Sequence, residues 1–434
     1  MSKSAPAVGN SRGGPGVTLS ALKVGIIGAG VSGLTAAWRL APLHEVCLFE
    51  REPRLGGHAH THTVTVGDRT AAVDTGFMVF NERTYPHFIA MLTALGVESR
   101  PSDMSFSVEC ARCDIAYSSV GLRGLFARPR RAFTTPHLSM LADILRFFRA
   151  GRTALADGSA APLSLGQFLE RHRFGDGLVR HFVLPMGGAI WSASSDAMRA
   201  FPAESYLRFL DNHGLLAASG QPVWRTIVGG SRSYVDRIAA ALGPAARVGA
   251  PVSAITRHSR GVTIATAAER VEVDAVVVAT HADEALALLG DPSDAEIAAL
   301  SPFRYSVNPT VLHGDASLVP ATPAARASWN VRMADCRDEH RPVAVTYDLA
   351  RLQGLTGVGS MLCTLNGRAT DAVYARMTYA HPILDRAALD AQRAVTALNG
   401  TRRTFFCGAH LRYGFHEDGV MSALAVVERL REAA

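Results

Sequence analysis

The chain has 434 residues, of which 48% are hydrophobic and 19% charged, and its formal net charge is +6. This composition is typical of a packed globular protein, and the length favours two domains over a single core. No apolar run reaches the ~18–20 residues of a membrane-spanning helix. Residues 1–21 are rich in Gly, Ser, Pro and Ala and lack an apolar signal sequence, which predicts a disordered lead-in and a cytoplasmic protein.

The first structured segment predicts a strand, a helix and a second strand. The apolar run at 23–28 has the character of a buried parallel strand, 31–40 is helical, and 45–50 forms the next strand. A Gly28-Ala-Gly30-Val-Ser-Gly33 sequence joins the first strand to the helix. In such a turn the first glycine permits the bend, the second lets the backbone approach a pyrophosphate, and the third allows close helix–strand packing. The pyrophosphate would lie at the helix N-terminus.

Glu50 ends the second strand, where a carboxylate can accept hydrogen bonds from ribose hydroxyls. An acid at this position would repel a 2′-phosphate, which argues against NADP. Gly56-Gly57 follow closely and can form a second anion-binding nest. The run Val73–Phe80 has Gly76 at its centre and can pass under a flat ring, because glycine permits close backbone approach. These features favour FAD over NAD.

Later segments suggest that one domain is assembled from separated pieces. Residues 82–220 are mostly helical in pattern, strands return at 246–279, and a strand at 403–407 precedes a final helix at 419–432. We therefore expect an α/β fold with a discontinuous Rossmann-like FAD-binding domain and an inserted α+β substrate domain. The predicted FAD-binding pieces are 22–81, 225–290 and 402–434, and the predicted substrate pieces are 82–224 and 291–401.

The order of these motifs resembles the flavin amine oxidase and phytoene desaturase superfamily. The glycine fingerprint, the acid and Arg-x-Gly-Gly are followed by Val-Ala-Thr at 278–280, Cys-Gly-Ala at 407–409 and Glu-Asp-Gly at 417–419. The resemblance implies that the last helix directs its N-terminus at the flavin, where backbone N–H groups favour negative charge. Longer runs such as VDTGFMVFNERTYP, PMGGAIWS, YAHP and YGFHEDG are similar to a bacterial branch found beside cyclopropane-fatty-acid synthase-like genes. One member of that branch desaturates methylated fatty acyl chains.

Together, the motifs and the resemblance predict a set of FAD contacts. They are Gly28, Gly30, Val31, Ser32, Gly33, Glu50, Arg51, Gly56, Gly57, His58, Thr75, Gly76, Phe77, Val252, Thr280, Gly408, Glu417, Asp418, Gly419 and Val420.

The chemistry is narrowed by a shortage of lysine. Many flavin amine oxidases hold a water near the flavin with a lysine, whereas this chain has only Lys3 and Lys23. We therefore expect a desaturase of fatty acyl or other apolar lipid chains, with the reacting carbon held about 3–3.5 Å from the flavin. The electron acceptor stays open. The alternatives are a flavin-dependent double-bond isomerase and a non-catalytic accessory protein that binds flavin and lipid.

Two groups of residues are candidates for this chemistry. His416 and Glu417 are the first candidates for a catalytic base, followed by His410 and His58, although His416 could instead only hydrogen-bond the cofactor or the backbone. The candidate substrate contacts, any of which could equally be ordinary core, are Met78, Phe80, Arg83, Met186, Trp191, Trp329 and Tyr413.

The positive charge is concentrated between residues 112 and 152, which hold eight arginines and two acids among many apolar residues. This mixture suits peripheral contact with an anionic membrane better than a nucleic-acid groove, and the alternative is a solvated basic face over a core helix.

The six cysteines are scattered and do not form a disulfide framework. Cys110-Ala-Arg-Cys113 is a single CxxC without a second pair at zinc spacing, so the sequence favours two reduced surface cysteines over a structural zinc site. No metal is predicted.

Overall fold

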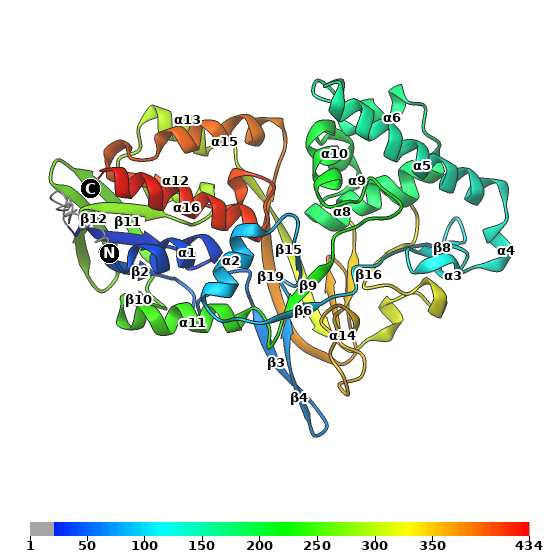
Figure 1. Ribbon diagram of the computed structural model, residues 1–434, viewed down its shortest axis with the longest axis horizontal. Coiled ribbons are helices and arrows are strands. Elements are labelled where there is room, and N and C mark those ends of the chain that lie inside the picture. The colour runs from blue at the N-terminus through cyan, green and yellow to red at the C-terminus, as the bar shows by residue number, and fades with distance from the viewer. Residues whose placement is uncertain (1–20, 434) are drawn as a thin grey trace, which may run out of the picture.

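The computed structural model describes residues 21–433, so the predicted lead-in falls outside it except for Ala21. The chain forms two lobes side by side, one around a parallel sheet and one around a larger mixed sheet (Figure 1). We call them the nucleotide lobe and the second lobe.

The nucleotide lobe is built on a five-stranded sheet in the order β10-β2-β1-β14-β20, with every neighbouring pair parallel. In chain order the strands are β1 (Lys23–Ile27), β2 (Glu45–Phe49), β10 (Ala246–Arg247), β14 (Ala275–Val278) and β20 (Thr404–Phe406). Their side chains are apolar on both faces because both faces are covered. This arrangement confirms the predicted α/β class.

Different elements cover the two faces of this sheet. On one face lie α1 (Val31–Leu40), α11 (Arg232–Leu242) and α16 (His416–Ala433). On the other lies an antiparallel sheet of β11 (Val252–His258), β12 (Gly261–Thr266) and β13 (Arg270–Val273), together with α12 (Ala282–Leu288). The parallel sheet thus takes strands from the beginning, middle and end of the chain.

The second lobe contains a seven-stranded sheet in the order β19-β15-β18-β17-β16-β7-β8, antiparallel except between β16 and β7. Its strands are β7 (Phe106–Cys110), β8 (Ile115–Ser118), β15 (Arg304–His313), β16 (Trp329–Met333), β17 (Val345–Asp348), β18 (Leu362–Leu365) and β19 (Val373–Ile383). A helical layer packs on it through a core of its own. Its helices are α5 (Thr135–Ala156), α6 (Leu165–Arg171), α7 (Asp176–Leu178), the π-helix η1 (Val179–Val183), α8 (Leu184–Trp191), α9 (Ser195–Ala200) and α10 (Ala203–Asn212).

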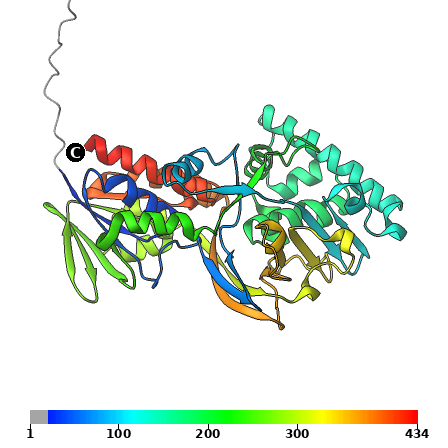
Figure 2. The ribbon, with the colours of Figure 1, turned by 60° about the horizontal axis from the view of Figure 1, so that its bottom comes forward.

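Smaller elements join the lobes. Figure 2 shows the hairpin of β3 (Thr61–Val66) and β4 (Arg69–Asp74) between the lobes. A second small sheet has β9 (Trp224–Ile227) between β5 (Phe80–Asn81) and β6 (Ser99–Pro101). The short helices α3 (Gly121–Leu125), α4 (Pro129–Ala132) and α14 (Leu349–Leu352) lie in the second lobe.

The predicted domain boundaries need correction at three helices. α2 (Pro86–Ala94) was assigned to the substrate domain, yet it buries Phe88 and Met91 in the core of the nucleotide lobe. α13 (Asp294–Leu300) and α15 (Arg386–Leu398) likewise pack on the other face of the parallel sheet. Periodicity reveals that a helix has an apolar stripe, but not which sheet that stripe covers. The mostly helical prediction for 82–220 also missed β6, β7 and β8.

Within residues 21–433, no helix combines the length and the apolar character needed to cross a membrane.

Candidate functional site

The glycine turn after β1 has the geometry that the sequence predicts. Gly28 has a positive φ of 94°, and its N–H donates to the carbonyl oxygen of Phe49 at 2.8 Å. A Cβ on Gly33 would lie 1.8 Å from the carbonyl oxygen of Gly28, so only glycine lets α1 pack this closely. A Cβ on Gly30 would meet no atom within 4 Å, so the space in front of this residue is open. That space lies at the start of α1.

The N-terminus of α1 is suited to an anion. Gly30 is its N-cap and provides no side-chain cap, and the first turn contains no acid. The N–H groups of Val31 and Ser32 are therefore left for an external acceptor. Gly57 has a φ of 57°, and a Cβ there would lie 3.1 Å from the Cα of Gly30. Two glycine loops thus meet over one helix end, as the fit of a pyrophosphate requires.

Glu50 lies at the carboxyl end of β2 and is buried. Its Oε2 accepts a hydrogen bond from the N–H of Ala29 at 2.7 Å, and its Oε1 accepts one from the N–H of Glu52 at 2.9 Å. These bonds hold the carboxylate beside the glycine turn, and its remaining lone pairs can accept ribose hydroxyls. Arg51 turns outward and pairs with Glu284, with 2.6 Å between Nη1 and Oε1.

The other predicted cofactor segments converge on this cradle. Thr280 follows β14, and its methyl group lies 3.2 Å from where a Cβ of Gly28 would be. Val252 opens β11, two residues after Ala250, whose N–H donates to the backbone oxygen of Glu50 at 2.8 Å. At the carboxyl end of β20, the N–H of Gly408 donates to the Oγ of Ser422 at 3.0 Å.

The start of α16 packs directly on the start of α1. A Cβ on Gly419 would lie 2.7 Å from the Cγ1 of Val31 and 2.8 Å from the Oγ of Ser32. The next residue, Val420, is buried in the core of the nucleotide lobe. The Oδ2 of Asp418 accepts the N–H of Phe415 at 2.9 Å, and burial raises the pKa of Asp418 to about 6. Two helix N-termini therefore lie together at the carboxyl ends of the parallel strands, where nucleotides bind in open α/β sheets.

A cluster of histidines faces this cradle. His58 directly follows Gly57, and its backbone oxygen accepts the N–H of Phe77 at 2.8 Å. A Cβ on Gly76 would lie 2.2 Å from that same oxygen, so the predicted glycine strand passes tightly beside His58. The ring centroid of His58 lies 5.1 Å from that of Tyr379 and 5.4 Å from that of His381. Its Nε2 is buried and has no hydrogen-bond partner among the described residues.

The hydrogen bonds around His381 determine its tautomer. The Nδ2 of Asn308 donates to the carbonyl oxygens of Ser306 at 3.0 Å and Tyr379 at 3.3 Å, which fixes the orientation of this amide. The same Nδ2 lies 3.2 Å from the Nδ1 of His381, and the Oγ of Ser192 lies 2.9 Å from that nitrogen. Because an amide nitrogen can only donate, this arrangement favours Nδ1 as an acceptor and the proton of neutral His381 on Nε2.

These imidazoles are uncharged at neutral pH. Burial lowers the pKa of His381 to about 4 and that of His60 to about 3. The pKa of His58 is held well below its usual value, chiefly by burial and then by the nearby imidazoles of His381, His281 and His416. The hydroxyl of Tyr379 lies 3.2 Å from the Nδ1 of His60 and 2.7 Å from the Oγ1 of Thr75. Neutral, hydrogen-bonded side chains, which we call the histidine face, thus adjoin the Gly57 loop of the cradle, with the cation Arg54 nearby.

The two residues predicted as catalytic bases have structural roles instead. The ring of His416 stacks on Phe77 at 3.5 Å between centroids, and its Nε2 lies 3.3 Å from the hydroxyl of Tyr234. Burial lowers its pKa to about 3. The Oε1 of Glu417 accepts the N–H of His87 at 3.0 Å, and its Oε2 accepts that of Phe88 at 2.9 Å. Glu417 therefore caps α2, and neither side chain is free to act as a base.

Comparison with known proteins gives the family. The family model for flavin containing amine oxidoreductase matches residues 31–313. The chain belongs to this family.

The similarity to individual members of the family extends over most of the chain. It is 28% identical over 369 residues to a Mycobacterium tuberculosis protein named as a flavin-containing monoamine oxidase, AofH, covering 80% of this chain and 75% of that one. The structure matches the CLA-producing fatty acid isomerase from P. acnes with a TM-score of 0.67 at 16% identity, covering 94% of this chain and 98% of that one. It also matches cyclohexylamine oxidase from Brevibacterium oxydans with a TM-score of 0.68 at 15% identity, covering 95% and 100%. The protein is an FAD-dependent oxidoreductase of the amine oxidase superfamily, and the glycine cradle has the geometry that suits the pyrophosphate of FAD.

The predicted substrate residues are spread over three cores. Phe80 is only 1% exposed and packs against Phe77 and Phe88 inside the nucleotide lobe, so its assignment to a substrate cavity is wrong. Met78 lies in the core under the mixed sheet. Arg83 donates from Nη2 to the backbone oxygen of Gly220 at 3.0 Å instead of pairing with its neighbour Glu82.

The remaining substrate candidates lie in the second lobe or at its border with the nucleotide lobe. Trp191 packs between Phe201 and Phe209, with centroids 4.8 and 4.9 Å away, and its indole Nε1 is buried without a partner among the described residues. Trp329 also has a buried, unpaired Nε1. Such donors are rare in protein interiors, where most buried polar groups have a hydrogen-bond partner. The other two candidates are Met186 and Tyr413, which belong to the same helical core as Trp191.

Several residues of the histidine face were missed as site residues. Tyr379 and His381 lie in the YAHP run, and alternate residues of a strand share a face, so the spacing could have indicated that the two act together. Asn308 and Ser192 carry no such signal, because only the fold brings β15 and the end of α8 to the same histidine.

The prediction of two reduced surface cysteines is wrong for Cys110, which is completely buried. Cys110 and Cys113 lie beside Cys336 and His181, from distant parts of the chain.

Proposed function

We propose that this protein is an FAD-dependent desaturase of lipid-linked or free fatty acyl chains, including methylated ones. The observation that carries the proposal is the neutral histidine face that adjoins the FAD cradle. His58 and His381 are both neutral, and their hydrogen-bond partners among the described residues include no carboxylate. A protonated amine would need an anionic partner when it leaves water, whereas an alkyl chain does not.

Apolar residues adjoin this face and suit such a chain. Ser192, which holds His381, directly follows Trp191 at the end of α8. Met186 on the same helix is buried among aromatic and aliphatic side chains. Each buried CH₂ group of an acyl chain contributes about 0.8 kcal/mol of binding free energy, so a long chain needs few polar contacts.

The residues divide the chemistry between them. FAD, when bound, accepts a hydride from the substrate. The Nε2 of His58 has no partner among the described residues, and we assign this nitrogen the proton that leaves the neighbouring carbon, which it accepts as a weak base because burial holds its pKa down. His381 presents its Nε2–H as a hydrogen-bond donor, which suits a carbonyl or carboxylate oxygen of the acyl group. Asn308 and Ser192 keep it in this tautomer.

The comparisons support a lipid substrate only in part. One structural neighbour is named as a fatty acid isomerase, and others are named as amine oxidases. The shortage of lysine argues against an amine, because many flavin amine oxidases hold a water near the flavin with a lysine. Of the two lysines in this chain, Lys23 pairs with Glu45 at the start of β1, with 3.7 Å between Nζ and Oε1, and Lys3 lies outside the described residues. We therefore prefer the acyl substrate.

Lipid extraction from cells with and without the protein tests this function. Desaturation predicts an acyl species that lacks two hydrogen atoms relative to its precursor and appears only in cells that contain the protein. A product of unchanged mass with a displaced double bond would establish an isomerase instead. Unchanged lipids together with turnover of amines would contradict the proposal.

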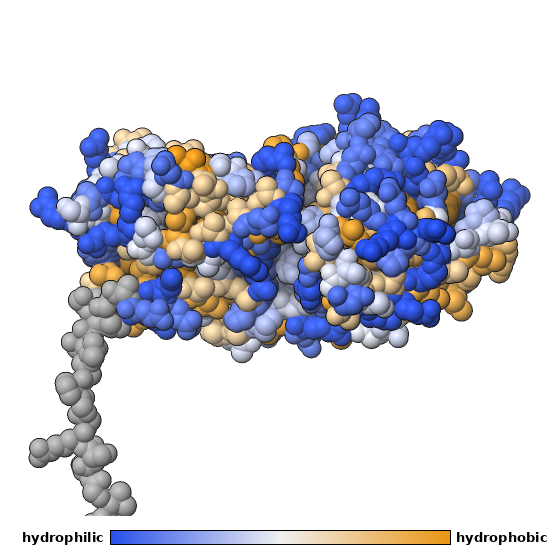
Figure 3. Space-filling model, turned by 90° about the horizontal axis from the view of Figure 1, so that it is seen from above, coloured by the Kyte–Doolittle hydropathy of each residue, from blue (hydrophilic) through white to orange (hydrophobic). Residues whose placement is uncertain are grey.

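We also propose that the second lobe contacts anionic membrane. Exposed apolar side chains gather on α3, α4 and α5, where Leu122 and Phe133 are each 75% exposed and Leu145 is 58% exposed. Figure 3 shows orange residues at the end of the molecule that these helices form. Among the arginines here, Arg128 and Arg131 pair with Asp114, whereas Arg123 and Arg130 have no ion-pair partner among residues 21–433. Free arginines beside exposed apolar groups suit an anionic lipid surface.

Vesicle sedimentation tests this surface. Binding should require anionic lipid and should weaken as salt rises, because screening shortens the reach of the arginines. Leu122→Ser with Phe133→Ser should reduce binding about tenfold, since two large apolar contacts are lost. Binding to neutral vesicles with equal strength would contradict the proposal.

A further inference from the structure

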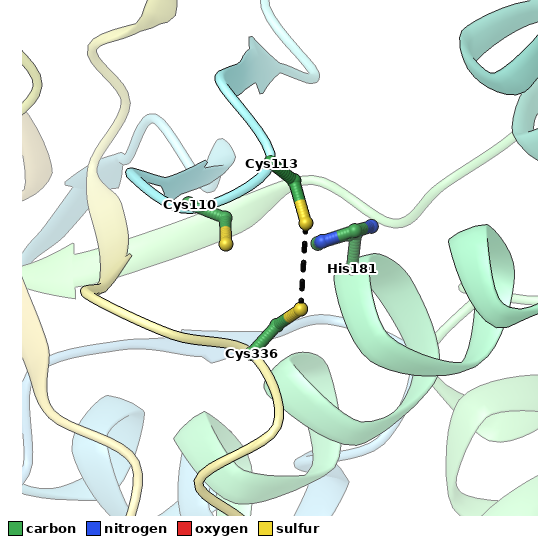
Figure 4. Close-up of side chains that lie close together, drawn as sticks. All are labelled: Cys110, Cys113, His181 and Cys336. Carbon is green, nitrogen blue, oxygen red and sulfur yellow. Dashed lines mark hydrogen bonds between the residues drawn. The ribbon is translucent and has the colours of Figure 1, made fainter.

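Three cysteines and one histidine meet in the second lobe, away from the FAD cradle. Cys110 ends β7, Cys113 lies in the turn before β8, Cys336 follows β16, and His181 is on the π-helix η1. Their sulfur and ring nitrogen atoms all lie within 4.8 Å of one another. Figure 4 shows the four side chains converging on a common point from three segments of the chain.

The distances fit a metal better than a disulfide. All six cysteines are free, and the Sγ atoms of Cys113 and Cys336 lie 3.6 Å apart. A disulfide would bring them to about 2.05 Å. Tetrahedral zinc with Zn–S bonds of about 2.3 Å places its sulfur ligands about 3.8 Å from each other. The Sγ–Sγ distance of 3.6 Å is therefore close to the edge length of a zinc tetrahedron. Small side-chain movements would bring the other ligand atoms to the same spacing.

His181 is the second, independent observation. The residue is 7% exposed, and neither Nδ1 nor Nε2 has a hydrogen-bond partner among the described residues. A buried imidazole with both nitrogens unpaired costs free energy that a metal ligand bond would recover at one of them. Its helical turn is the wider π form, which often occurs at functional sites.

The backbone positions the ligands without any metal. β16 runs parallel to β7 with Met333 opposite Cys110, so the chain leaving β16 delivers Cys336 to the β7–β8 turn. The N–H of Ala111 donates to the oxygen of Met333 at 2.9 Å. On the helical side, the hydroxyl of Tyr117 donates to the backbone oxygen of His181 at 2.7 Å. Both sides of the cluster are thus fixed by the fold.

The surroundings suit the charge of such a site. Three thiolates and an imidazole around Zn²⁺ carry a net charge of about −1. Arg180 directly precedes His181, and its Nη1 lies 3.4 Å from the backbone oxygen of Cys336 and 2.6 Å from the Oε1 of Glu339. Arg112 lies between the two hairpin cysteines and pairs with Asp335 at 3.4 Å.

We propose that Cys110, Cys113, Cys336 and His181 bind one Zn²⁺ as a closed structural site. Four protein ligands leave no open position for a substrate, which separates this site from a catalytic zinc. The metal links the β7–β8–β16 edge of the mixed sheet to the π-helix that leads into α8. It therefore clamps the sheet to the helical layer of the second lobe. The sequence alone showed only one pair of its ligands.

Metal analysis of the FAD-loaded protein, purified without chelators, tests the proposal. We expect about one zinc per chain. Cys336→Ser and His181→Ala should each lose most of this zinc and unfold at a temperature several degrees lower, while the flavin spectrum is kept. Cys47→Ala is the matched control, because Cys47 is also a buried cysteine but lies in β2. It should retain the zinc. Should the substituted proteins fail to fold, replacement of zinc by Co²⁺ in the unaltered protein gives a second measurement, with tetrahedral thiolate bands at longer wavelengths than flavin absorption.

Two results would overturn the site. One is zinc-supplied, reduced protein that contains no metal. The other is zinc that stays at full occupancy in both Cys336→Ser and His181→Ala. A disulfide between Cys113 and Cys336 that is found in protein purified under reducing conditions would likewise contradict the metal site.

Discussion

The FAD cradle and the histidine face beside it are built in different ways. The cradle is mainly backbone: Gly28, Gly30, Gly33 and Gly57 shape two loops, and the N–H groups of a helix end point between them. The histidine face is built from side chains whose positions depend on elements distant in the chain. His381, for example, is held by Ser192 from the end of α8.

This difference decides which tests separate the two regions. Substitutions in the cradle should act on cofactor affinity, whereas substitutions in the histidine face should act on turnover with the cofactor retained. Acid should affect the histidine face more than the glycine loops, which carry no titratable side chains.

The largest expected effect is in the cradle. Gly33→Ala should prevent FAD binding and destabilise the fold, because its Cβ would lie 1.8 Å from a backbone oxygen. Gly30→Ala should fold normally, since its Cβ meets no protein atom within 4 Å, yet should weaken FAD binding more than about 100-fold by filling the pyrophosphate space. The ratio of flavin to protein absorbance and the thermal midpoint measure the two effects. Tight FAD binding by Gly30→Ala would contradict the cradle as the pyrophosphate site.

Acid should destabilise the protein between pH 6.5 and 4.5. In the folded state burial lowers the pKa of four well-buried histidines to about 3 or 4: His213, His381, His410 and His416. The unfolded chain protonates them near pH 6.5, so this stability is lost as pH falls. Asp74 and Asp418, raised to about 6 by burial, act in the opposite direction.

The difference in number between these histidines and carboxyls sets how steeply the free energy of unfolding depends on pH. With His58 and His60, whose pKa values are also lowered, the histidines clearly outnumber the two carboxyls, so unfolding takes up at least about two protons and the free energy of unfolding should fall by at least roughly 2–3 kcal/mol per pH unit near pH 5. Denaturant unfolding of the FAD-loaded protein at several pH values measures this slope. His381→Gln should make it shallower. Stability that is constant or increases from pH 6.5 to 4.5 would show that the histidines are not buried as described.

The histidine face should control turnover. His58→Gln should slow flavin reduction by substrate about 100-fold, because it removes the proposed proton acceptor. Its FAD affinity should stay within about threefold if the cradle is intact. His410→Gln is a suitable control, since His410 is also a buried histidine, packs edge-on against Phe303 and has no part in the reaction that we propose. Equal rates for His58→Gln and the unaltered protein would remove His58 from the mechanism.

The smallest effect should come from the ribose contact. Glu50→Gln keeps the shape of the side chain but loses its charge. The amide NH2 group cannot accept a hydrogen bond, so one of the two backbone N–H groups, of Ala29 or of Glu52, loses its acceptor. We expect FAD affinity to fall about tenfold, the magnitude of one charged hydrogen bond. Titration of the FAD-free protein with FAD measures it. Unchanged affinity would mean that Glu50 only braces the glycine turn.

The sequence predicted the cradle well because each of its parts has a local cause. Gly33 must be glycine because of a residue five positions earlier, and Glu50 acts at the end of its own strand. It predicted the histidine face poorly because the causes there are long-range. His416 was chosen for its place at the start of α16, but whether its ring faces a substrate or stacks on Phe77 depends on packing. Similarly, Cys336 joins Cys110 only through the pairing of β16 with β7, and His181 comes from the π-helix η1 on the other side.

We propose above all that the histidine face accepts an uncharged acyl chain. Anaerobic mixing of the FAD-loaded protein with phospholipids that carry methyl-branched acyl chains, and in parallel with a panel of primary amines, tests it most directly. We expect the lipids, and not the amines, to bleach the flavin absorbance. Bleaching by amines alone, or by no lipid in a panel that varies chain length, branching and head group, would contradict it.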